Sequence, residues 1–353
     1  MPILTDTLLL WYAQNRRDLP WRNSLMPYNV WLSEIILQQT QVAQGLPYYL
    51  RFLEAYPKVD DLAAASEEQV LKLWQGLGYY SRARNLHHTA KTIVHEYDGV
   101  FPDTYKGLKT LKGVGDYTAS AIASICYNEP VAVLDGNVFR VLARVFGIDT
   151  PINTTAGRKI FKEKAELNLK RTQPGRYNQA IMDFGAMQCK PKKPDCASCP
   201  LQADCVAFQQ GKIGVLPVKL KKTKVRVRYL NYLILRPFDQ TIVLQKRTGK
   251  GIWQNLYQFP LVETTREVRE SSELLKRSEA LSKANVGAIK LLNDKPVKHQ
   301  LSHQKLLVNF WEITPENKRD ALCDERSIVV NRSEIDQFPV PRLIERFLNN
   351  FTI

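Results

Sequence analysis

The stretch that decides the fold is Leu108–Ala119, which reads LKTLKGVGDYTA and contains two glycines one residue apart. Gly113 and Gly115 permit a tight turn, because glycine adopts backbone angles that other residues avoid. They also leave successive backbone N–H groups bare at the start of a following helix, which we expect to run through Ile122. A phosphate binds well at such a helix N-terminus. The stretch therefore predicts two helices joined by a turn that can hold a phosphate.

An aspartate follows this turn in the stretch VLDGNVFRV (133–141). We expect Asp135 to lie at the start of another helix, with its carboxylate facing the glycine turn. One interpretation is a helix N-cap, because aspartate side chains accept hydrogen bonds from the first turn of a helix. The other is a carboxylate that takes part in catalysis. The local pattern alone leaves both open.

Four cysteines gather in the short stretch 189–205, within a lysine- and proline-rich context: Cys189, Cys196, Cys199 and Cys205. In a chain without a secretory signal, thiols this close together are ligands more often than disulfide partners. Zinc and a [4Fe–4S] cluster both accept four sulfur ligands. Zinc usually lies between two closely spaced cysteine pairs, and only Cys196 and Cys199 form such a pair here. Both ligands stay open at this point.

The composition agrees with a nucleic-acid partner. The 353 residues are enough for two domains, and 50 Lys and Arg against 35 Asp and Glu give a formal net charge of +15. Such a surplus favours a polyanion through counterion release from phosphates, although many basic proteins bind no nucleic acid. No apolar run is long enough to span a bilayer, and Met1–Leu10 lacks the basic leader of a signal peptide. We therefore expect a soluble, cytoplasmic, nucleoid-associated monomer.

The sequence pattern changes from helical to strand-rich after about Phe208. Up to there the pattern is amphipathic and helical, with helix stops expected at Pro20, Pro27, Pro47, Pro57, Gly99–Pro102, Pro130 and Pro174. Residues 209–228 end in a mostly cationic run and are expected to be a linker. Strand patterns follow at 229–236, 241–247, 306–313 and 327–330, and helical patterns at 265–284 and 340–349. The sequence predicts an all-α first part and an α+β second part.

The glycine turn, the aspartate and the cysteine spacing together resemble the endonuclease III superfamily of DNA glycosylases, with its helix–hairpin–helix motif and [4Fe–4S] loop. The resemblance implies a helical glycosylase domain over 1–208, with a six-helix module at 28–140 and an iron–sulfur module formed by 1–27 and 141–208. It also implies that Asp135 is the catalytic aspartate, that Gly113 and Gly115 contact DNA, and that Cys189, Cys196, Cys199 and Cys205 bind the cluster.

The residue two positions after the second glycine separates two kinds of superfamily member. Lyase members carry a lysine there, whose amine attacks the sugar and forms a Schiff base. This chain has Tyr117, and a phenol cannot form an imine. Lys112 lies nearby but stands at the wrong place in the motif. The resemblance therefore implies a monofunctional glycosylase that uses water.

Three further stretches resemble the adenine DNA glycosylase family: RDLPWR (17–22), VWLSEIILQQTQV (30–42) and GLGYYSRARNL (76–86). That family removes adenine mispaired with 8-oxoguanine, so the implied partner is double-stranded DNA with A:8-oxoguanine or A:G mispairs, from which the adenine is flipped. Two alternatives remain: a glycosylase for another mispaired base, such as T opposite G, and a non-catalytic mismatch-binding protein. The presence of both Glu34 and Asp135 argues against the second.

The reaction asks for two carboxyl groups in different environments. Breaking an N-glycosidic bond puts positive charge on the sugar and negative charge on the purine, so adenine needs a proton, best delivered at N7. An acid that stays protonated near neutral pH should lie among apolar residues, as Glu34 does beside Trp31 and Ile35. Asp135, at a helix N-terminus, can stay ionised and face the oxocarbenium-like sugar.

The resemblance assigns further roles position by position. Tyr117 would hydrogen-bond near the reacting centre, and Asn137 would orient Asp135 or the water. Gln39 and Tyr79 match positions that enter the duplex beside the lesion, although Tyr79 could instead be a core residue. The remaining matched positions, which line the purine pocket or contact DNA, are Trp21, Arg22, Arg82 and Gln179.

Residues 229–353 resemble the Nudix-like domain of that family. GIWQNLYQFP (251–260) matches its turn, but the glycine and paired acids of a metal-binding Nudix box are missing, so we expect no pyrophosphatase activity. The stretch HQLSH (299–303) aligns with the loop that reads 8-oxoguanine. Leu301 stands where an aromatic residue is usual and stacks less well on bases, whereas Ser302 and His303 keep their polar capacity to read the oxidised purine.

Overall fold

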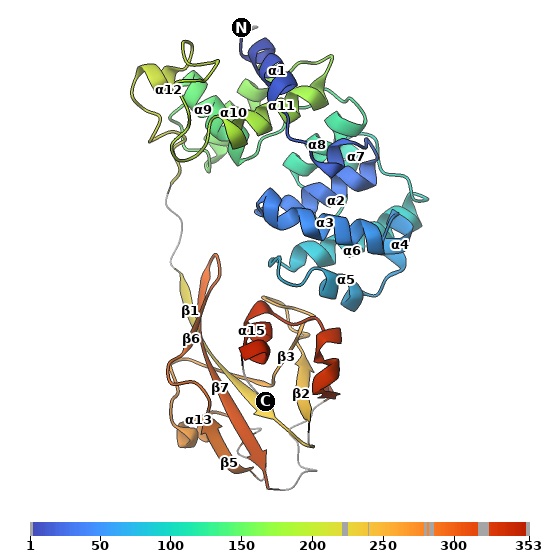
Figure 1. Ribbon diagram of the computed structural model, residues 1–353, viewed down its shortest axis with the longest axis vertical. Helices are drawn as coiled ribbons and strands as arrows, with labels where there is room; N and C mark the ends of the chain where they lie inside the picture. The colour runs from blue at the N-terminus through green and yellow to red at the C-terminus, as the bar shows by residue number, and fades with distance from the viewer. Residues whose placement is uncertain are drawn as a thin grey trace. The chain divides into compact units, whose positions relative to one another are not determined.

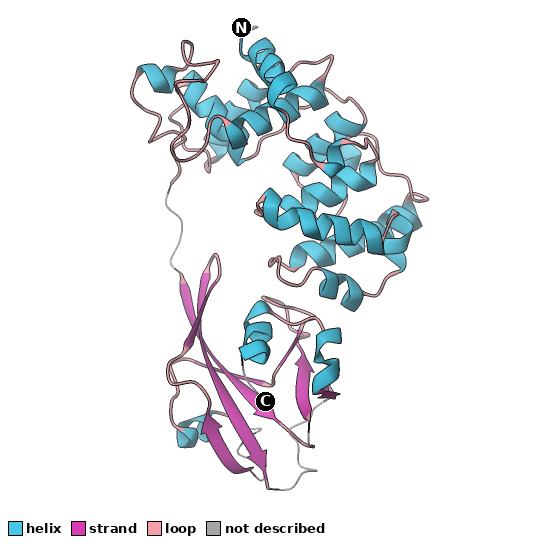
Figure 2. Cartoon of the chain, in the orientation of Figure 1, coloured by secondary structure: helices cyan, strands magenta, loops and turns pink. Residues whose placement is uncertain are grey.

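The chain divides into two compact units. A computed structural model describes residues 3–220, 225–238, 240–278, 281, 286–316 and 325–350. The first unit consists of Met1–Ala64 and Asn85–Lys221, and the second of Ala65–Arg84 and Lys222–Ile353. Helices build the first unit and strands dominate the second, as Figures 1 and 2 show. No helix of the described residues is long and apolar enough to cross a membrane.

The first unit is a stack of helices. They are α1 (Ile3–Asn15), η1 (Pro20–Arg22), α2 (Pro27–Leu37), α3 (Val42–Ala55), α4 (Val59–Ala64), most of α6 (Ser81–Glu96), α7 (Tyr105–Leu108), α8 (Asp116–Cys126), α9 (Gly136–Phe146), α10 (Thr155–Leu167), α11 (Pro174–Met187) and α12 (Val206–Gln209). Helix α11 packs against α1, α8 and α9, and α2 packs on α8. Their shared core includes Leu8, Val141, Phe161 and Tyr177, each at most 1% exposed.

Four prolines do not act as the expected helix stops. Pro20, Pro27 and Pro174 instead begin η1, α2 and α11. Proline suits the first turn, because its fixed backbone angle is already helical and its missing N–H would have no partner there. Pro47 lies inside α3, where the burial of Tyr49 and Phe52 offsets the lost backbone hydrogen bond.

The second unit contains two sheets. A five-stranded sheet has the order β4-β1-β7-β5 with β6 paired to β7, and a three-stranded sheet has the order β3-β2-β8. The strands are β1 (Arg226–Leu235), β2 (Thr241–Lys246), β3 (Tyr257–Gln258), β4 (Leu261–Thr264), β5 (Val286–Leu291), β6 (Val297–Gln300), β7 (Gln304–Pro315) and β8 (Ser327–Asn331). Strands β1 and β7 run parallel, and the second half of β1 is buried throughout, as befits a strand flanked on both sides.

Short helices cover these sheets. They are α5 (Glu67–Leu73), α13 (Ser271–Arg277), η2 (Arg332–Gln337) and α15 (Arg342–Asn350). Phe347 of α15 stacks on Phe310 of β7, with ring centres 3.9 Å apart. The helix expected at 265–284 is wrong for 265–270, where the chain is irregular, and α13 ends before Ser278. Residues 279–280 and 282–284 of that expectation lie outside the described residues.

Residues 65–84 belong to the second unit, although the sequence predicts them within the 28–140 module. Glu68 of α5 accepts hydrogen bonds from Lys246 Nζ at 2.6 Å and from the Tyr257 hydroxyl at 2.8 Å. Both partners come from the three-stranded sheet. These charge-assisted bonds tie the loop that follows α5 to the strand-rich part of the chain.

Candidate active site

A cavity of about 890 Å³ lies in the first unit. Its walls come from η1, the end of α2, the glycine turn and the starts of α8 and α9. The predicted site residues that line it are Trp21, Arg22, Glu34, Gln39, Gly113, Gly115, Tyr117, Asp135 and Asn137. Segments far apart in the sequence therefore place the predicted catalytic and DNA-binding residues of this unit, except Gln179, around one cavity.

Glu34 faces this cavity from α2 and is only 8% exposed. Burial raises its pKa to about 7, because the carboxylate loses its hydration. A hydrogen bond from Tyr117 acts in the opposite direction, the charge of Asp135 raises the pKa, and the charge of Arg22 lowers it. Glu34 can therefore hold and release a proton near neutral pH.

Asp135 is the N-cap of α9. Its Oδ1 accepts from the Val138 backbone N–H at 2.7 Å, and its Oδ2 accepts from Asn137 Nδ2 at 2.7 Å. Burial raises the pKa of Asp135, whereas these two donors lower it by stabilising the carboxylate. Capping and lining the cavity are compatible roles, and this carboxylate has the geometry for both.

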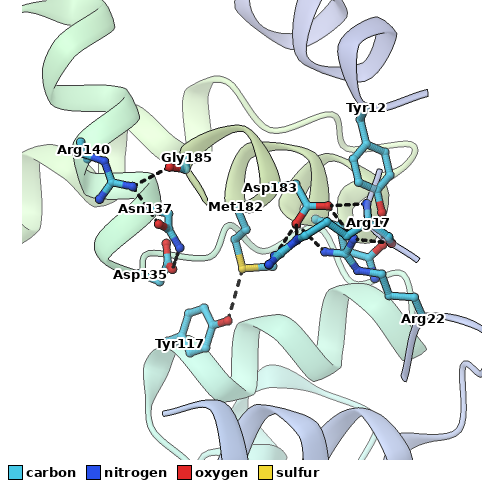
Figure 3. Close-up of polar contacts among 11 residues, drawn as sticks. Tyr12, Arg17, Arg22, Tyr117, Asp135, Asn137, Arg140, Met182, Asp183 and Gly185 are labelled. Carbon is cyan, nitrogen blue, oxygen red and sulfur yellow. Dashed lines mark hydrogen bonds and ion pairs between the residues drawn. The ribbon is translucent and has the colours of Figure 1, made fainter. Parts of the chain in front are cut away.

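Arg140 connects Asn137, on the wall of the cavity, to the cysteine stretch. Its Nη2 donates to Asn137 Oδ1 at 2.8 Å and to the Gly185 carbonyl at 2.6 Å, as Figure 3 shows. Its Nε donates to the Cys189 carbonyl at 2.7 Å. Sequence reasoning missed Arg140, although its spacing of three residues from Asn137 puts both on one face of a helix.

Asp183 of α11 is the other residue that sequence reasoning missed. Its side chain is fully buried and pairs with both Arg17 and Arg22, as Figure 3 shows. Burial alone would raise the pKa of Asp183, but the hydrogen bonds and charges of these arginines hold it below its usual value. The only sequence signal was an acidic residue inside an apolar helix, which demands a buried partner.

Aromatic side chains complete the pocket. Trp21 is 7% exposed and packs edge-on against Tyr49, with ring centres 5.1 Å apart. The Tyr117 hydroxyl lies 3.2 Å from Met182 Sδ (Figure 3). Gln179, in contrast, does not line the described cavity, because its Oε1 accepts from the Tyr12 hydroxyl at 2.8 Å.

The turn residues expected to meet DNA are accessible in different ways. Gly113 has a φ of +83°, and a Cβ there would come within 2.8 Å of Asn85 Cβ. Gly115 is the N-cap of α8 and faces open space, so the first N–H groups of that helix are approachable. Gln39, in the loop after α2, is exposed with a φ of +56°, an uncommon conformation for a residue with a side chain.

A second cavity, of about 490 Å³, lies in the second unit and is lined by Tyr79 and by the turn Leu301–His303 between β6 and β7. Tyr79 is 47% exposed with a φ of +46°, so it is not a core residue, and its hydroxyl contacts Ser302 Oγ. Arg82 is buried at 9% exposure and lies 5.1 Å over the Trp74 ring, where it supports the loop that carries Tyr79. The structure thus brings the predicted wedge residue and the predicted lesion-reading turn together.

The four cysteines of the 189–205 stretch line one small cavity. Arg144, 2% exposed, places Nη1 3.4 Å from Cys189 Sγ, and this buried cation suits negative charge on sulfur. Within the described part of the chain, no three His, Cys, Asp or Glu side chains are arranged to hold a metal ion. In type and in placement around one cavity, the cysteines nevertheless fit a four-thiolate ligand set.

Comparison with known proteins identifies the family. Residues 32–166 match the HhH-GPD superfamily base excision DNA repair protein, and residues 231–350 match the NUDIX domain. An adenine DNA glycosylase of Buchnera aphidicola subsp. Acyrthosiphon pisum is 33% identical over 99% of this chain and 97% of its own length. The chain belongs to the adenine DNA glycosylase family. It is a DNA glycosylase of base excision repair, with DNA as its partner, and the predicted fold class is confirmed.

Other relatives agree with this assignment. The adenine DNA glycosylase of Buchnera aphidicola subsp. Baizongia pistaciae is 35% identical, over 88% of this chain and 86% of that protein. The human adenine DNA glycosylase is 44% identical over 58% of this chain, which spans only 39% of that longer protein. Among solved structures, a thermostable thymine-DNA glycosylase superimposes with a TM-score of 0.55 at 29% identity, over 59% of this chain and 96% of its own. An endonuclease III–DNA complex, at 21% identity and a TM-score of 0.52, shares the fold.

Proposed function

We propose that this adenine DNA glycosylase excises adenine mispaired with 8-oxoguanine, and more weakly adenine mispaired with G, by acid-assisted hydrolysis. The observation that carries the proposal is Glu34, a buried carboxyl with a pKa of about 7, on the wall of the cavity that Asp135 also lines. An acid tuned in this way suits proton delivery to a poor leaving group at neutral pH.

The proposed reaction uses both carboxyl groups. Glu34 donates its proton to N7 of a flipped adenine, and the C1′–N9 bond then breaks with its electron pair passing to the purine. The Asp135 carboxylate faces the positive charge that develops on the sugar. Water adds to C1′ and loses a proton, and the ionised Glu34 takes up a proton before the next turnover. Tyr117 cannot form an imine, so the product is an abasic site and not a cut strand.

Exposed side chains at strained backbone positions would stabilise the flipped state. Gln39 and Tyr79 both adopt positive φ angles, which hold a side chain in a direction that an ordinary loop does not. We infer that each enters the duplex beside the lesion, while Trp21 and Arg22 receive the purine. Gln179 stays a predicted pocket residue, and its Oε1 accepts from the Tyr12 hydroxyl.

The second unit would read the base opposite adenine. The Tyr79 hydroxyl and Ser302 contact each other on the wall of the second cavity. The edge of an incoming base could therefore take the place of Tyr79 as the hydrogen-bond partner of Ser302. Leu301 would wedge between bases and His303 would supply a further polar contact. Base-edge hydrogen bonds of this kind are each worth about 1–3 kcal/mol of discrimination.

A [4Fe–4S] cluster would be held by Cys189, Cys196, Cys199 and Cys205. The four cysteines would supply its thiolate ligands, and the bound cluster would order the 189–205 loop by joining them. Lys190, Lys192 and Lys193 on that loop would then face phosphates of the duplex. We expect the protein to act as a monomer at the nucleoid. The domain bounds at 1–208, 209–228 and 229–353 stay a prediction, and residues 221–224 of the linker lie outside the described residues.

A single-turnover assay tests the proposal, with A, T or C opposite 8-oxoguanine and A opposite G as separate duplexes. We expect release of adenine in both A duplexes, faster opposite 8-oxoguanine, and no release of T or C. The duplex with T is included because the chain is similar to a thymine-DNA glycosylase, so release of T is the main competing outcome. Release of T in place of A would refute the substrate, and tight binding with no base release would refute the assigned chemistry.

A further inference from the structure

An ion cluster of Asp183, Arg17 and Arg22 borders the active-site cavity, and the proposed hydrolysis gives Asp183 no role. The buried Asp183 carboxylate accepts at Oδ1 from Arg17 Nε at 2.8 Å and at Oδ2 from Arg22 Nη1 at 2.5 Å. A second bond joins Arg22 Nη2 to Oδ1 at 2.8 Å. Figure 3 shows both guanidiniums converging on this one carboxylate. The cluster therefore contains one anion and two cations.

The pairing fixes the direction of Arg22. Two parallel N–H···O bonds to one carboxylate hold the guanidinium plane as well as its position. Nη1 also donates to the Arg17 carbonyl at 3.1 Å, and the guanidinium carbon lies 5.8 Å from the centre of the Tyr12 ring. The Arg22 side chain is 11% exposed, so loss of Asp183 would leave a nearly buried cation without its carboxylate. An unpaired buried charge is costly, which favours pairing with another anion.

Glu34 is a carboxyl group on the same cavity that already interacts electrostatically with Arg22. Arg22 and Glu34 line the same cavity, and the charge of Arg22 already lowers the pKa of Glu34. An arginine released from Asp183 could pair with Glu34 and stabilise its ionised form, which has no proton to give. The other titratable groups that face Glu34 are Tyr117, Asp135 and Cys126.

We propose that Asp183 is a positioning residue that withholds Arg22 from Glu34, so that the guanidinium stays available for the purine and the acid stays protonated. The inference rests on the proposed role of Glu34 as the acid. It explains why a fully buried carboxylate lies beside an enzyme cavity with two arginines, a more elaborate arrangement than packing of α11 requires.

The test is the pH dependence of the single-turnover rate of adenine release, measured for Asp183→Asn at saturating enzyme. The rate should fall on the alkaline side as Glu34 ionises, and the variant should show this fall at least about one pH unit lower than the wild type. Adding Arg22→Gln should abolish the displacement, although it also weakens the purine pocket. Asp6→Asn, which removes an exposed carboxylate paired with Lys170, is the matched control and should leave the profile in place.

Two further variants keep the outcome decisive. If Asp183→Asn does not accumulate as folded protein, Asp183→Asn with Arg17→Gln removes one cation as well, and the same displacement is expected because Arg22 still lacks its carboxylate. If Glu34→Gln releases no adenine and the pH profile of Asp183→Asn matches that of the wild type, Asp183 only supports the fold. A Glu34→Gln variant that keeps the wild-type profile would instead overturn the acid assignment, and this inference with it.

Discussion

Replacing Glu34 by glutamine should stabilise the protein at the same time as it removes base excision. The glutamine keeps the size and hydrogen-bonding capacity of the side chain, so it can still accept from Tyr117. It never ionises, however, and it has no proton to deliver to N7 of adenine. The gain in stability and the loss of excision have one origin. Burial of Glu34, at 8% exposure, disfavours its charged form and so keeps the proton on the acid.

The size of the stabilisation follows from the pKa of Glu34, which rises from 4.5 to about 7 on folding. Because the folded state binds this proton more tightly, the stability that Glu34 contributes is fully present below pH 4.5 and is lost as the pH rises to 7. A gap of about 2.5 pKa units corresponds to roughly 3 kcal/mol. The variant should therefore match the wild type near pH 4.5 and exceed it by about 3 kcal/mol at pH 8.

Urea unfolding followed by far-ultraviolet circular dichroism between pH 5 and 8 measures this difference, because the first unit holds most of the helix. Asp6→Asn again serves as the control, because it removes one negative charge at an exposed position of the same unit. Wild-type and Glu34→Gln free energies of unfolding that stay parallel over this range would refute the claim that Glu34 is held protonated by burial. Adenine release by the variant would separately refute its role as the acid.

The remaining predictions concern the other parts of the site. Asp135→Asn should lower the single-turnover rate by about 10²–10³-fold while duplex binding persists, because a preorganised charge is lost; a rate near that of the wild type would exclude the aspartate from the reaction. Ser302→Ala with His303→Ala should lower the preference for A:8-oxoguanine over A:G by about tenfold, measured as a ratio of excision rates, and an unchanged ratio would move opposite-base reading elsewhere. Purified protein should show the broad visible absorbance of an iron–sulfur cluster, reduced in Cys199→Ser, whereas colourless protein with one bound zinc would contradict the cluster. Deletion after Lys219 should leave adenine excision in place but lower the same preference ratio, and loss of all excision would show that the helical unit needs the strands.

That the two carboxyl groups line one cavity could be predicted from the sequence, because their signals are local. Glu34 stands among apolar residues on one helix, and Asp135 stands at a helix start, so a short window contains each argument. Asp183 could not be assigned in this way, because its partner Arg17 is 166 residues away and neither residue belongs to a periodic pattern. Ion pairs of this kind become visible only when α11 and the N-terminal segment lie together.

The strand-rich unit was harder to predict for a different reason. Strand β3 has two residues and β4 and β6 have four each, which is too short for an alternating pattern to stand out. Their pairing depends on β1, β2 and β7, whose longer apolar runs could be predicted. The helix predicted at 265–284 is wrong in its first part because Val268 is buried from an irregular segment. Apolar spacing in this stretch therefore does not require a helix.

The placement of residues 65–84 links these observations to function. Sequence order puts Tyr79 among the helices of the first unit, yet the segment that carries it bonds to the C-terminal part of the chain. Glu68 accepts from Lys246 of β2, and Gln75 donates to Glu345 of α15 at 2.8 Å. Tyr79 and Ser302, assigned to the two sides of the lesion, therefore belong to one compact unit, whereas Glu34 and Asp135 belong to the other. In the proposed function, DNA contacts replace the Tyr79–Ser302 contact on binding. A base edge that restores the lost hydrogen bonds would make this exchange favourable, whereas one that cannot do so would leave polar groups unsatisfied. This difference would be the physical basis of the proposed discrimination.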